Sequence, residues 1–159
     1  MDARTVPTLR RLDVARSPHR TLPRQVLAAA RQKPDQIFLR FLEVSGGERG
    51  ITFRGFAEGV TRAAVSLEGL GVEAGDRVLF FAENSPEWQM FALGAQALRA
   101  EPAAIFASLS AESAQGIARR VRPRVAFVSG PSHWDKLAPI AAELIAAGLR
   151  GIVTAAPLA

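Results

Sequence analysis

The sequence predicts an α/β fold in which a parallel sheet is flanked by helices on both faces and preceded by an N-terminal β-hairpin. From residue 77 onward, short apolar segments of strand length alternate with longer segments of helical periodicity. Such alternation indicates right-handed crossovers between parallel strands. Residues 78–82 are almost all apolar, which is typical of a strand covered by helices on both sides. The order of the strands is not predicted.

The first elements are a short helix and the hairpin. We predict a helix over residues 25–32, ended by Pro34, because apolar residues recur there at helical spacing. Two short apolar segments, 37–44 and 50–53, then lie on either side of a turn at 45–47 that contains two glycines. Short apolar segments around a glycine turn predict a β-hairpin.

A longer helix follows the hairpin. Thr52 is the predicted N-cap, and Gly71 is the predicted residue at which the helix ends. The apolar residues that share one face of this helix are Phe56, Val60, Ala63, Ala64, Leu67 and Leu70. An apolar stripe of this kind predicts a helix packed against a core.

The strand at 78–82 leads into a well-marked helix. Ser85 is a suitable N-cap, Pro86 suits the first turn, and Glu87 lies at the positive end of the dipole. This helix is predicted to run to about residue 99. The cycle then repeats, with strands at 103–106, 125–128 and 151–154 and helices at 111–121 and 133–147. Since ligands bind at the carboxyl ends of parallel strands, we expect the loop after residue 154 to belong to a longer protein.

Composition limits the classes of function. A chain of 159 residues with 48% apolar content is long enough for one domain with a core. It has no cysteine, so disulfides and cysteine-based zinc sites are excluded, and His19 and His133 are too few to form a metal site alone. No segment approaches the ~18 apolar residues of a membrane span. We expect a cytoplasmic protein.

The positive charge is concentrated near the N-terminus. The net charge is +5, and residues 1–24 hold six arginines against two aspartates. Residues 1–20 are therefore predicted to form a basic, extended arm, and residues 21–159 the folded part. An arginine-rich leader also fits an organellar transit peptide, although a solvated tail is the favoured interpretation. Nucleic acid is not the expected partner, because the basic residues are not interleaved with aromatic ones.

Short motifs occur in a fixed order along the chain. They are Leu22-Pro23 before the first helix, Pro34-Asp35 before the first strand, Ile51-Thr52-Phe53 at the start of the long helix, then Leu70-Gly71-Val72-Glu73-Ala74-Gly75-Asp76-Arg77-Val78 and Asn84-Ser85-Pro86-Glu87-Trp88. Their order and spacing over residues 21–154 resemble the start of the adenylate-forming superfamily, and the last motif looks most like fatty acyl-CoA synthetases. The resemblance implies a partial N-terminal domain of such an enzyme.

The resemblance also implies a reaction. Members of this superfamily use ATP and Mg²⁺ to convert a carboxylate into an acyl-adenylate, and the synthetases then transfer the acyl group to coenzyme A. Their phosphate loop is rich in Ser, Thr and Gly and ends in Pro-Lys. This sequence holds no such loop, and its only lysines are Lys33 and Lys136. We therefore expect no catalytic residue, no metal ligand and no adenylation by this chain alone.

One segment resembles a coenzyme A contact. Residues 104–112 are similar to the strand-end loop that lies against the nucleotide of coenzyme A in acetyl-CoA synthetase-like members, and Phe106 is the implied contact. Ala107 and Ser108 replace two glycines that permit close backbone approach. The alternative interpretation, which we favour, makes Phe106 part of the core and Ser110 a helix N-cap with Glu112 in the first turn.

Other side chains have plainer interpretations. Trp88, with Met90 and Phe91, is assigned to the core rather than to an acyl-binding wall. His133 with Asp135 lacks a nucleophile or second base, so it is a poor catalytic cluster. The arginines at 119, 120, 122 and 124 are interpreted as a solvated helix end rather than an anion site. Asp76 and Arg77 are expected to tie their turn to the next strand.

Two functions remain open from the sequence. The first is the N-terminal portion of an acyl-CoA synthetase, whose partner is the remainder of the enzyme or a complementary subunit. The second is a non-catalytic binding or interaction module derived from such a domain, docking through an exposed sheet edge. Self-association into a homo-oligomer is expected where that edge and its apolar face are uncovered. The acyl substrate is not predicted.

Overall fold

The computed structural model describes residues 21–42 and 46–155. In chain order the elements are α1 (Leu22–Gln32), β1 (Ile37–Leu42), β2 (Glu48–Thr52), α2 (Phe53–Gly69), β3 (Arg77–Phe81), α3 (Pro86–Ala97), β4 (Glu101–Ile105), α4 (Ala111–Val121), β5 (Val125–Val128), α5 (Pro131–Leu137), the 3₁₀ helix η2 (Ala138–Ile140), α6 (Ala141–Ala146) and β6 (Gly151–Thr154). The predicted arm at 1–20, the end of the first strand at 43–44 and the tail at 156–159 lie outside the described residues.

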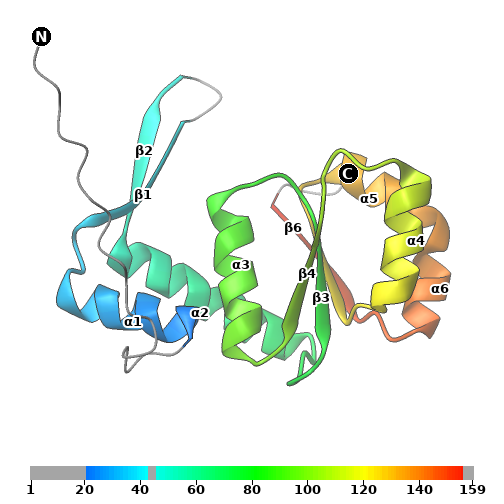
Figure 1. Ribbon diagram of the computed structural model, residues 1–159, viewed down its shortest axis with the longest axis horizontal. Helices are drawn as coiled ribbons and strands as arrows, with labels where there is room; N and C mark the ends of the chain where they lie inside the picture. The colour runs from blue at the N-terminus through cyan, green and yellow to red at the C-terminus, as the bar shows by residue number, and fades with distance from the viewer. Residues whose placement is uncertain (1–20, 43–45, 156–159) are drawn as a thin grey trace, which may run out of the picture.

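Four parallel strands form the main sheet, in the order β4-β3-β5-β6. The chain moves outward from β3 to β4 through α3, and then returns across β3 to β5 through α4. Helices α2 and α3 cover one face of this sheet, and α4, α5 and α6 cover the other (Figure 1). The prediction of a parallel sheet covered on both faces is confirmed.

Two apolar cores lie on the two faces of the sheet. Side chains alternate along a strand, so Val78 and Phe80 of β3 pack beneath α2 and α3, whereas Leu79 and Phe81 pack beneath α4, α5 and α6. All four of these side chains are completely buried. β5 alternates in the same way. The uninterrupted apolar sequence of β3 thus reflects burial on both sides.

The hairpin is confirmed as a separate two-stranded sheet of antiparallel β1 and β2. It projects from the end of the helical layer formed by α1 and α2 (Figure 1). Phe38 anchors its base, since the Phe38 ring centroid lies 4.7 Å from the rings of both Phe53 and Phe56. The preceding helix, α1, starts at Leu22, three residues earlier than predicted, because Pro23 occupies its first turn.

The predicted boundaries of α2 are confirmed. The Thr52 side chain accepts a hydrogen bond from the Gly55 N–H at 3.1 Å, as an N-cap does. Gly71 follows the helix with a φ of +75°, a left-handed conformation that glycine adopts without steric cost. This geometry turns the chain into the loop that leads to β3.

The single helix predicted over 133–147 is wrong. The structure has α5, η2 and α6 in succession, and α5 already begins at Pro131. Pro139 explains the break, because a proline has no N–H for an intrahelical hydrogen bond and its ring clashes with the preceding turn. The break lets Leu137, Ile140 and Leu144 all face the same core.

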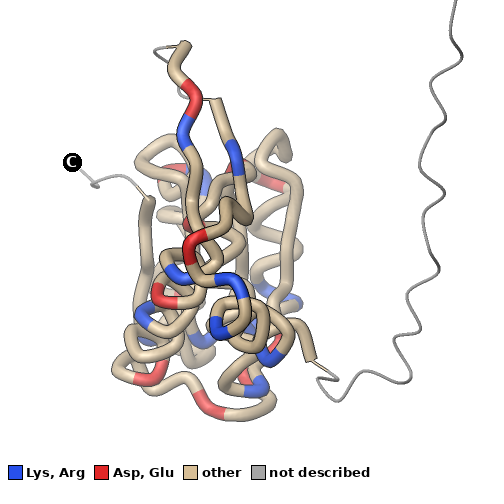
Figure 2. The backbone as a smooth tube through the Cα atoms, turned by 90° about the vertical axis from the view of Figure 1, so that its left-hand side faces the viewer, with Lys and Arg blue, Asp and Glu red and all other residues tan. Residues whose placement is uncertain are grey.

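Acidic and basic residues are mixed along the described backbone. On the side that Figure 2 faces, both signs alternate over the helical layer, with no continuous basic stripe in view. Several of these charges are paired across elements, including Arg54 with Asp35 at 3.0 Å and Arg119 with Glu143 at 2.9 Å. Within residues 21–42 and 46–155, no helix combines the length and the apolar character needed to cross a membrane.

Candidate functional site

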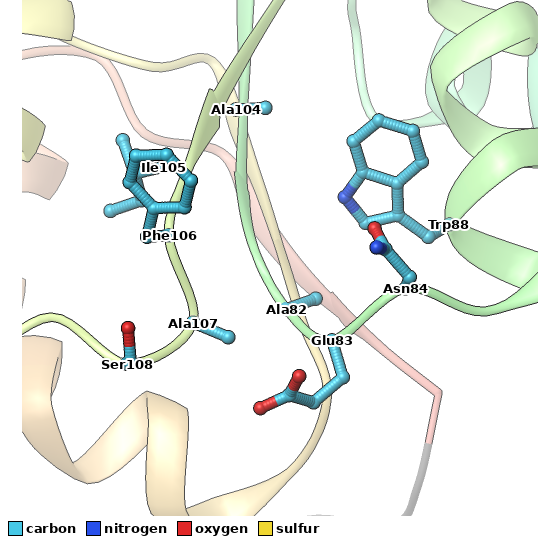
Figure 3. Close-up of a pocket in the computed structure, with 9 residues that line it drawn as sticks. All are labelled: Ala82, Glu83, Asn84, Trp88, Ala104, Ile105, Phe106, Ala107 and Ser108. Carbon is cyan, nitrogen blue, oxygen red and sulfur yellow. The ribbon is translucent and has the colours of Figure 1, made fainter.

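A pocket of about 480 Å³ lies at the carboxyl ends of β3 and β4 (Figure 3). The two strands are neighbours, but β3 continues into α3 on one face of the sheet and β4 into α4 on the other. Connections that leave toward opposite faces open a crevice between adjacent strand ends. The residues that line the pocket are Ala82, Glu83, Asn84, Trp88, Ala104, Ile105, Phe106, Ala107 and Ser108.

The wall contributed by the β3–α3 connection is fixed by a helix cap. The Ser85 hydroxyl accepts a hydrogen bond from the backbone N–H of Trp88 at 3.1 Å, and Pro86 occupies the first turn of α3. Trp88 also packs edge-on against Phe80, with ring centroids 5.4 Å apart. The assignment of Trp88 to the core is therefore correct for its contact with Phe80, and the same side chain lines the pocket as well.

The opposite wall is the β4–α4 connection, which contains Phe106. The interpretation of Phe106 as a core residue is wrong, because the residue is 79% exposed. It follows the last residue of β4 and emerges at the carboxyl end of the edge strand. In Figure 3 its ring and the Trp88 indole lie on opposite sides of the β4 end.

The rest of this connection follows the prediction and adds one contact. Ser110 caps α4 by accepting the Ser113 N–H at 3.2 Å, and Glu112 lies in the first turn. Lys136 of α5 donates from Nζ to the Leu109 carbonyl at 2.9 Å, so it ties the connection to the neighbouring helix. The sequence gives no sign of the Lys136 contact, because its partner is a backbone atom 27 residues away.

A second group at this edge joins β3 to β5. The Glu83 N–H donates to the Ser129 hydroxyl at 2.6 Å, across the gap between the two strand ends. The carboxylate oxygen Oε1 of Glu83 lies 3.9 Å from Nε2 of His133, which is buried. Asp135, considered with His133 in the sequence, is exposed. Glu83 was not singled out from the sequence, although its position directly after a buried strand marks the ligand-binding edge.

The amino ends of the strands carry a structural ion pair. The Arg124 guanidinium donates from Nε to Asp76 Oδ2 at 3.0 Å, and the Glu73 N–H donates to the same oxygen at 2.9 Å. Partial burial raises the pKa of Asp76, but the Glu73 hydrogen bond, the Arg124 hydrogen bond and charge, and the charge of Arg77 together lower it below its ordinary value. Asp76 thus ties its turn to the start of β5.

The arginine cluster splits between separate partners. Arg119 contacts both carboxylate oxygens of Glu143 in α6, at 3.0 and 2.9 Å, and Arg124 is held by Asp76. Arg122 ends α4 with a φ of +50°. Arg119, Arg120 and Arg122 are exposed, which agrees with the interpretation of a solvated helix end, whereas Arg124 is half-buried in its ion pair with Asp76.

The pocket fits a neutral ligand group better than a triphosphate. None of its nine lining residues is Lys or Arg, and Glu83 places a carboxylate in it. Among the residues that the structure describes, no group of three or more His, Asp and Glu side chains is arranged to hold a metal ion. The residues that line the pocket therefore do not fit ATP phosphates or Mg²⁺. The exposed Phe106 ring instead offers an apolar face to a ligand.

Comparison with known proteins decides the family. Residues 26–157 match the family described as AMP-binding enzyme. The chain belongs to that family. The AMP-binding fold is also seen in the acetoacetyl-CoA synthetase from Streptomyces lividans, which superposes with a TM-score of 0.74 at 23% identity over 83% of this chain and 21% of that one. The parallel sheet, the hairpin and the helical layers are thus those of the N-terminal region of adenylate-forming enzymes.

Two curated relatives differ in the share of their length that this chain matches. The long-chain-fatty-acid–CoA ligase FadD15 of Mycobacterium bovis is 27% identical over 126 residues, which are 79% of this chain and 21% of that protein. The uncharacterised protein Rv1549 of Mycobacterium tuberculosis is 37% identical over 79 residues, which are 50% of this chain and 43% of that protein. The chain spans about a fifth of the ligase and less than half of Rv1549.

Proposed function

We propose that this chain is the N-terminal portion of an ATP-dependent acyl-CoA synthetase that acts on a fatty acid. The complete enzyme joins the carboxylate to AMP and then forms a thioester with coenzyme A. The observation that carries the proposal is the match of residues 26–157 to AMP-binding enzymes. The printed activity of the relative FadD15, a long-chain-fatty-acid–CoA ligase, favours a fatty acid as the substrate class.

On this proposal the 159 residues do not adenylate a carboxylate by themselves. The sequence has no Ser/Thr/Gly-rich loop ending in Pro-Lys to hold the triphosphate. Both of its lysines have other contacts, since Lys33 lies over the Phe53 ring at 4.4 Å and Lys136 donates to Leu109. ATP and Mg²⁺ are bound by the remainder of the synthetase or by a complementary subunit, in the cytoplasm, with residues 1–20 as a basic arm.

The part of the reaction that this chain serves is the binding of coenzyme A. Phe106 presents an exposed ring beside a pocket at the ligand-binding edge of the sheet. A purine base of the coenzyme would stack against this ring, as bases do on aromatic side chains. Ala107 and Ser108, in place of the two glycines of the resembling loop, add side-chain atoms at the approach to the backbone.

A second candidate function is a non-catalytic binding module. The observation that favours it is Rv1549, because 79 matched residues make up 43% of that protein, whereas 126 make up 21% of FadD15. Rv1549 is therefore much shorter than the ligase. The coding DNA after residue 159 discriminates the two functions. A frame that continues into a phosphate loop supports the synthetase, and a stop codon supports the module.

Isothermal titration of the purified chain with coenzyme A, and separately with ATP and Mg²⁺, tests the site. We expect coenzyme A to bind, ATP to give no heat, and Phe106→Ala to abolish the coenzyme A signal. Ile145→Ala is the matched control, since Ile145 is also an exposed apolar residue, 62% accessible, but lies on α6. No coenzyme A binding by the folded chain would overturn the assignment of Phe106. ATP–pyrophosphate exchange by the chain would overturn the claim of inactivity.

A further inference from the structure

His133 is a buried polar residue, and one of its ring nitrogens has no hydrogen-bond partner among the residues that the structure describes. It is 9% exposed, and its ring lies edge-on to Phe81 with centroids 4.9 Å apart. Nδ1 lies 3.4 Å from the Ser132 hydroxyl, but Nε2 has no hydrogen bond among the described residues. Buried polar groups in folded proteins are nearly always hydrogen-bonded, so an exception calls for a specific explanation.

The carboxylate of Glu83 is the acidic group that faces this nitrogen. Its Oε1 lies 3.9 Å from Nε2, slightly beyond hydrogen-bond range, and the Glu83 side chain is 73% exposed. The Glu83 backbone is held, because its N–H donates to Ser129. Because the side chain is exposed, a small rotation of it would bring Oε1 within hydrogen-bond distance of Nε2. In Figure 3 the Glu83 carboxylate is turned toward the side of the pocket on which Ala107 and Ser108 lie.

The chemistry of the pocket restricts which part of a ligand it holds. A carboxylate accepts hydrogen bonds and repels phosphate, and no cation lines the pocket to offset this repulsion. The remaining walls are mostly apolar or aromatic, among them Trp88, Ile105 and Phe106. The group that fits is flat, uncharged and equipped with a hydrogen-bond donor remote from phosphate. In coenzyme A, the adenine base with its 6-amino group meets these conditions.

We propose that Glu83 accepts a hydrogen bond from the 6-amino group of the coenzyme A adenine, with His133 as the residue that positions the carboxylate. This inference rests on the proposed coenzyme A function of the site. One Glu83 oxygen accepts a hydrogen bond from the Nε2–H of His133, and the other is then turned toward the base. The phosphates lie outside the pocket, away from the carboxylate, and their cations come from elsewhere in the synthetase.

Discrimination between two ligands tests the inference. The dissociation constants of coenzyme A and of its 6-deamino analogue, in which hydrogen replaces the amino group, are measured by titration on the full chain. We expect the wild type to prefer coenzyme A about tenfold, the effect of one hydrogen bond to a charged acceptor. Glu83→Ala is expected to bind the two ligands with equal dissociation constants. Glu87→Gln, the matched control, removes an exposed charge from the first turn of α3, outside the pocket, and keeps the preference.

Two His133 variants separate positioning from a purely structural role. His133→Leu removes the N–H, so the ratio of the two dissociation constants should fall toward one. His133→Gln retains a donor and should keep most of the preference for coenzyme A. A structural defect would weaken the binding of both ligands equally and leave the ratio of their dissociation constants unchanged. Circular dichroism of each variant confirms that it is folded.

The outcomes distinguish this inference from the proposed function. If coenzyme A binds through Phe106 but Glu83→Ala leaves the preference intact, the Glu83 contact is overturned and the coenzyme A site stands. If the folded wild type binds no coenzyme A, both are overturned. Adenosine carries the same amine without any phosphate, so it is added as a competitor. Displacement of coenzyme A by adenosine supports recognition of the base, and failure to displace it counts against that recognition.

Discussion

Gly94 of α3 lies directly against the backbone of Ala64 in α2. A Cβ placed on Gly94 would be 2.8 Å from the Ala64 nitrogen and 3.0 Å from the Ala63 Cβ. Because the obstacle is backbone, it cannot rotate away. The two helices form the layer that supports Trp88 and one wall of the pocket, so their close approach sets the position of the candidate site.

Gly94→Ala is therefore expected to destabilise the fold by about 2 kcal/mol, the typical cost of overpacking a core. Urea unfolding followed by circular dichroism measures this change. Gly116→Ala is the matched control, because Gly116 lies within α4 with nothing within 4 Å of its added Cβ. The control should be more stable than the wild type by about 0.5–1 kcal/mol, since alanine has a higher helix propensity than glycine. Equal stability of the two variants would contradict the close helix contact.

Asp76 is expected to make stability depend on pH. Its folded pKa is lowered from the ordinary value of 3.8, so the stabilisation that it provides is complete above that value and is lost as the pH falls through the folded pKa. Asp76→Asn should cost about 1.5–3 kcal/mol at pH 7, the range for a hydrogen bond to a charged group, and less at pH 3. Urea midpoints at the two pH values measure the difference.

Asp35→Asn is the control for this pH dependence. Asp35 pairs with Arg54 at the same distance of 3.0 Å, but their side chains are 83% and 57% exposed. Exposed pairs contribute little because water screens them. The urea midpoint of Asp35→Asn should follow that of the wild type at both pH values. An equal loss in both variants would show that Asp76 has no special role in joining its turn to β5.

The Ser85 cap is expected to control the environment of Trp88. Ser85→Ala removes the acceptor of the Trp88 N–H and should cost about 1 kcal/mol. Ser85→Asp keeps an acceptor and a favourable charge at the helix start, so it should restore stability. The chain has a second tryptophan, Trp134 in α5, so the fluorescence maximum is measured in a Trp134→Phe background, where it reports on Trp88 and the pocket wall. A shift to longer wavelength in the alanine variant alone is the expected result, and an identical spectrum in both variants would count against it.

Local sequence patterns explain most of the fold. The helix over 111–121 and the strands over 125–128 and 151–154 occur where predicted, because caps and apolar segments define them within a few residues. The exposure of Phe106 was not predicted, since an aromatic residue after a strand is typical of a core and only the strand order places β4 at an edge. The approach of Glu83 to His133 likewise depends on β3 and β5 being neighbours.

Lys136 is expected to hold the connection that presents Phe106. Its Nζ donates to the Leu109 carbonyl at 2.9 Å, three residues after Phe106, while its own carbonyl accepts from Gln115 Nε2 at 2.8 Å. Lys136→Met keeps a long apolar side chain but removes the ammonium, which donates to Leu109 and lies 5.5 Å from the Phe81 ring centroid. Amides of residues 106–110 should then exchange with deuterium about tenfold faster, a ratio that corresponds to one lost hydrogen bond.

Lys33→Met, the control, removes the other lysine, whose contact is the Phe53 ring far from this connection. If both variants exchange at the wild-type rate in this segment, Lys136 does not position Phe106. If only Lys136→Met exchanges faster and its affinity for coenzyme A also falls, the order of this connection contributes to binding.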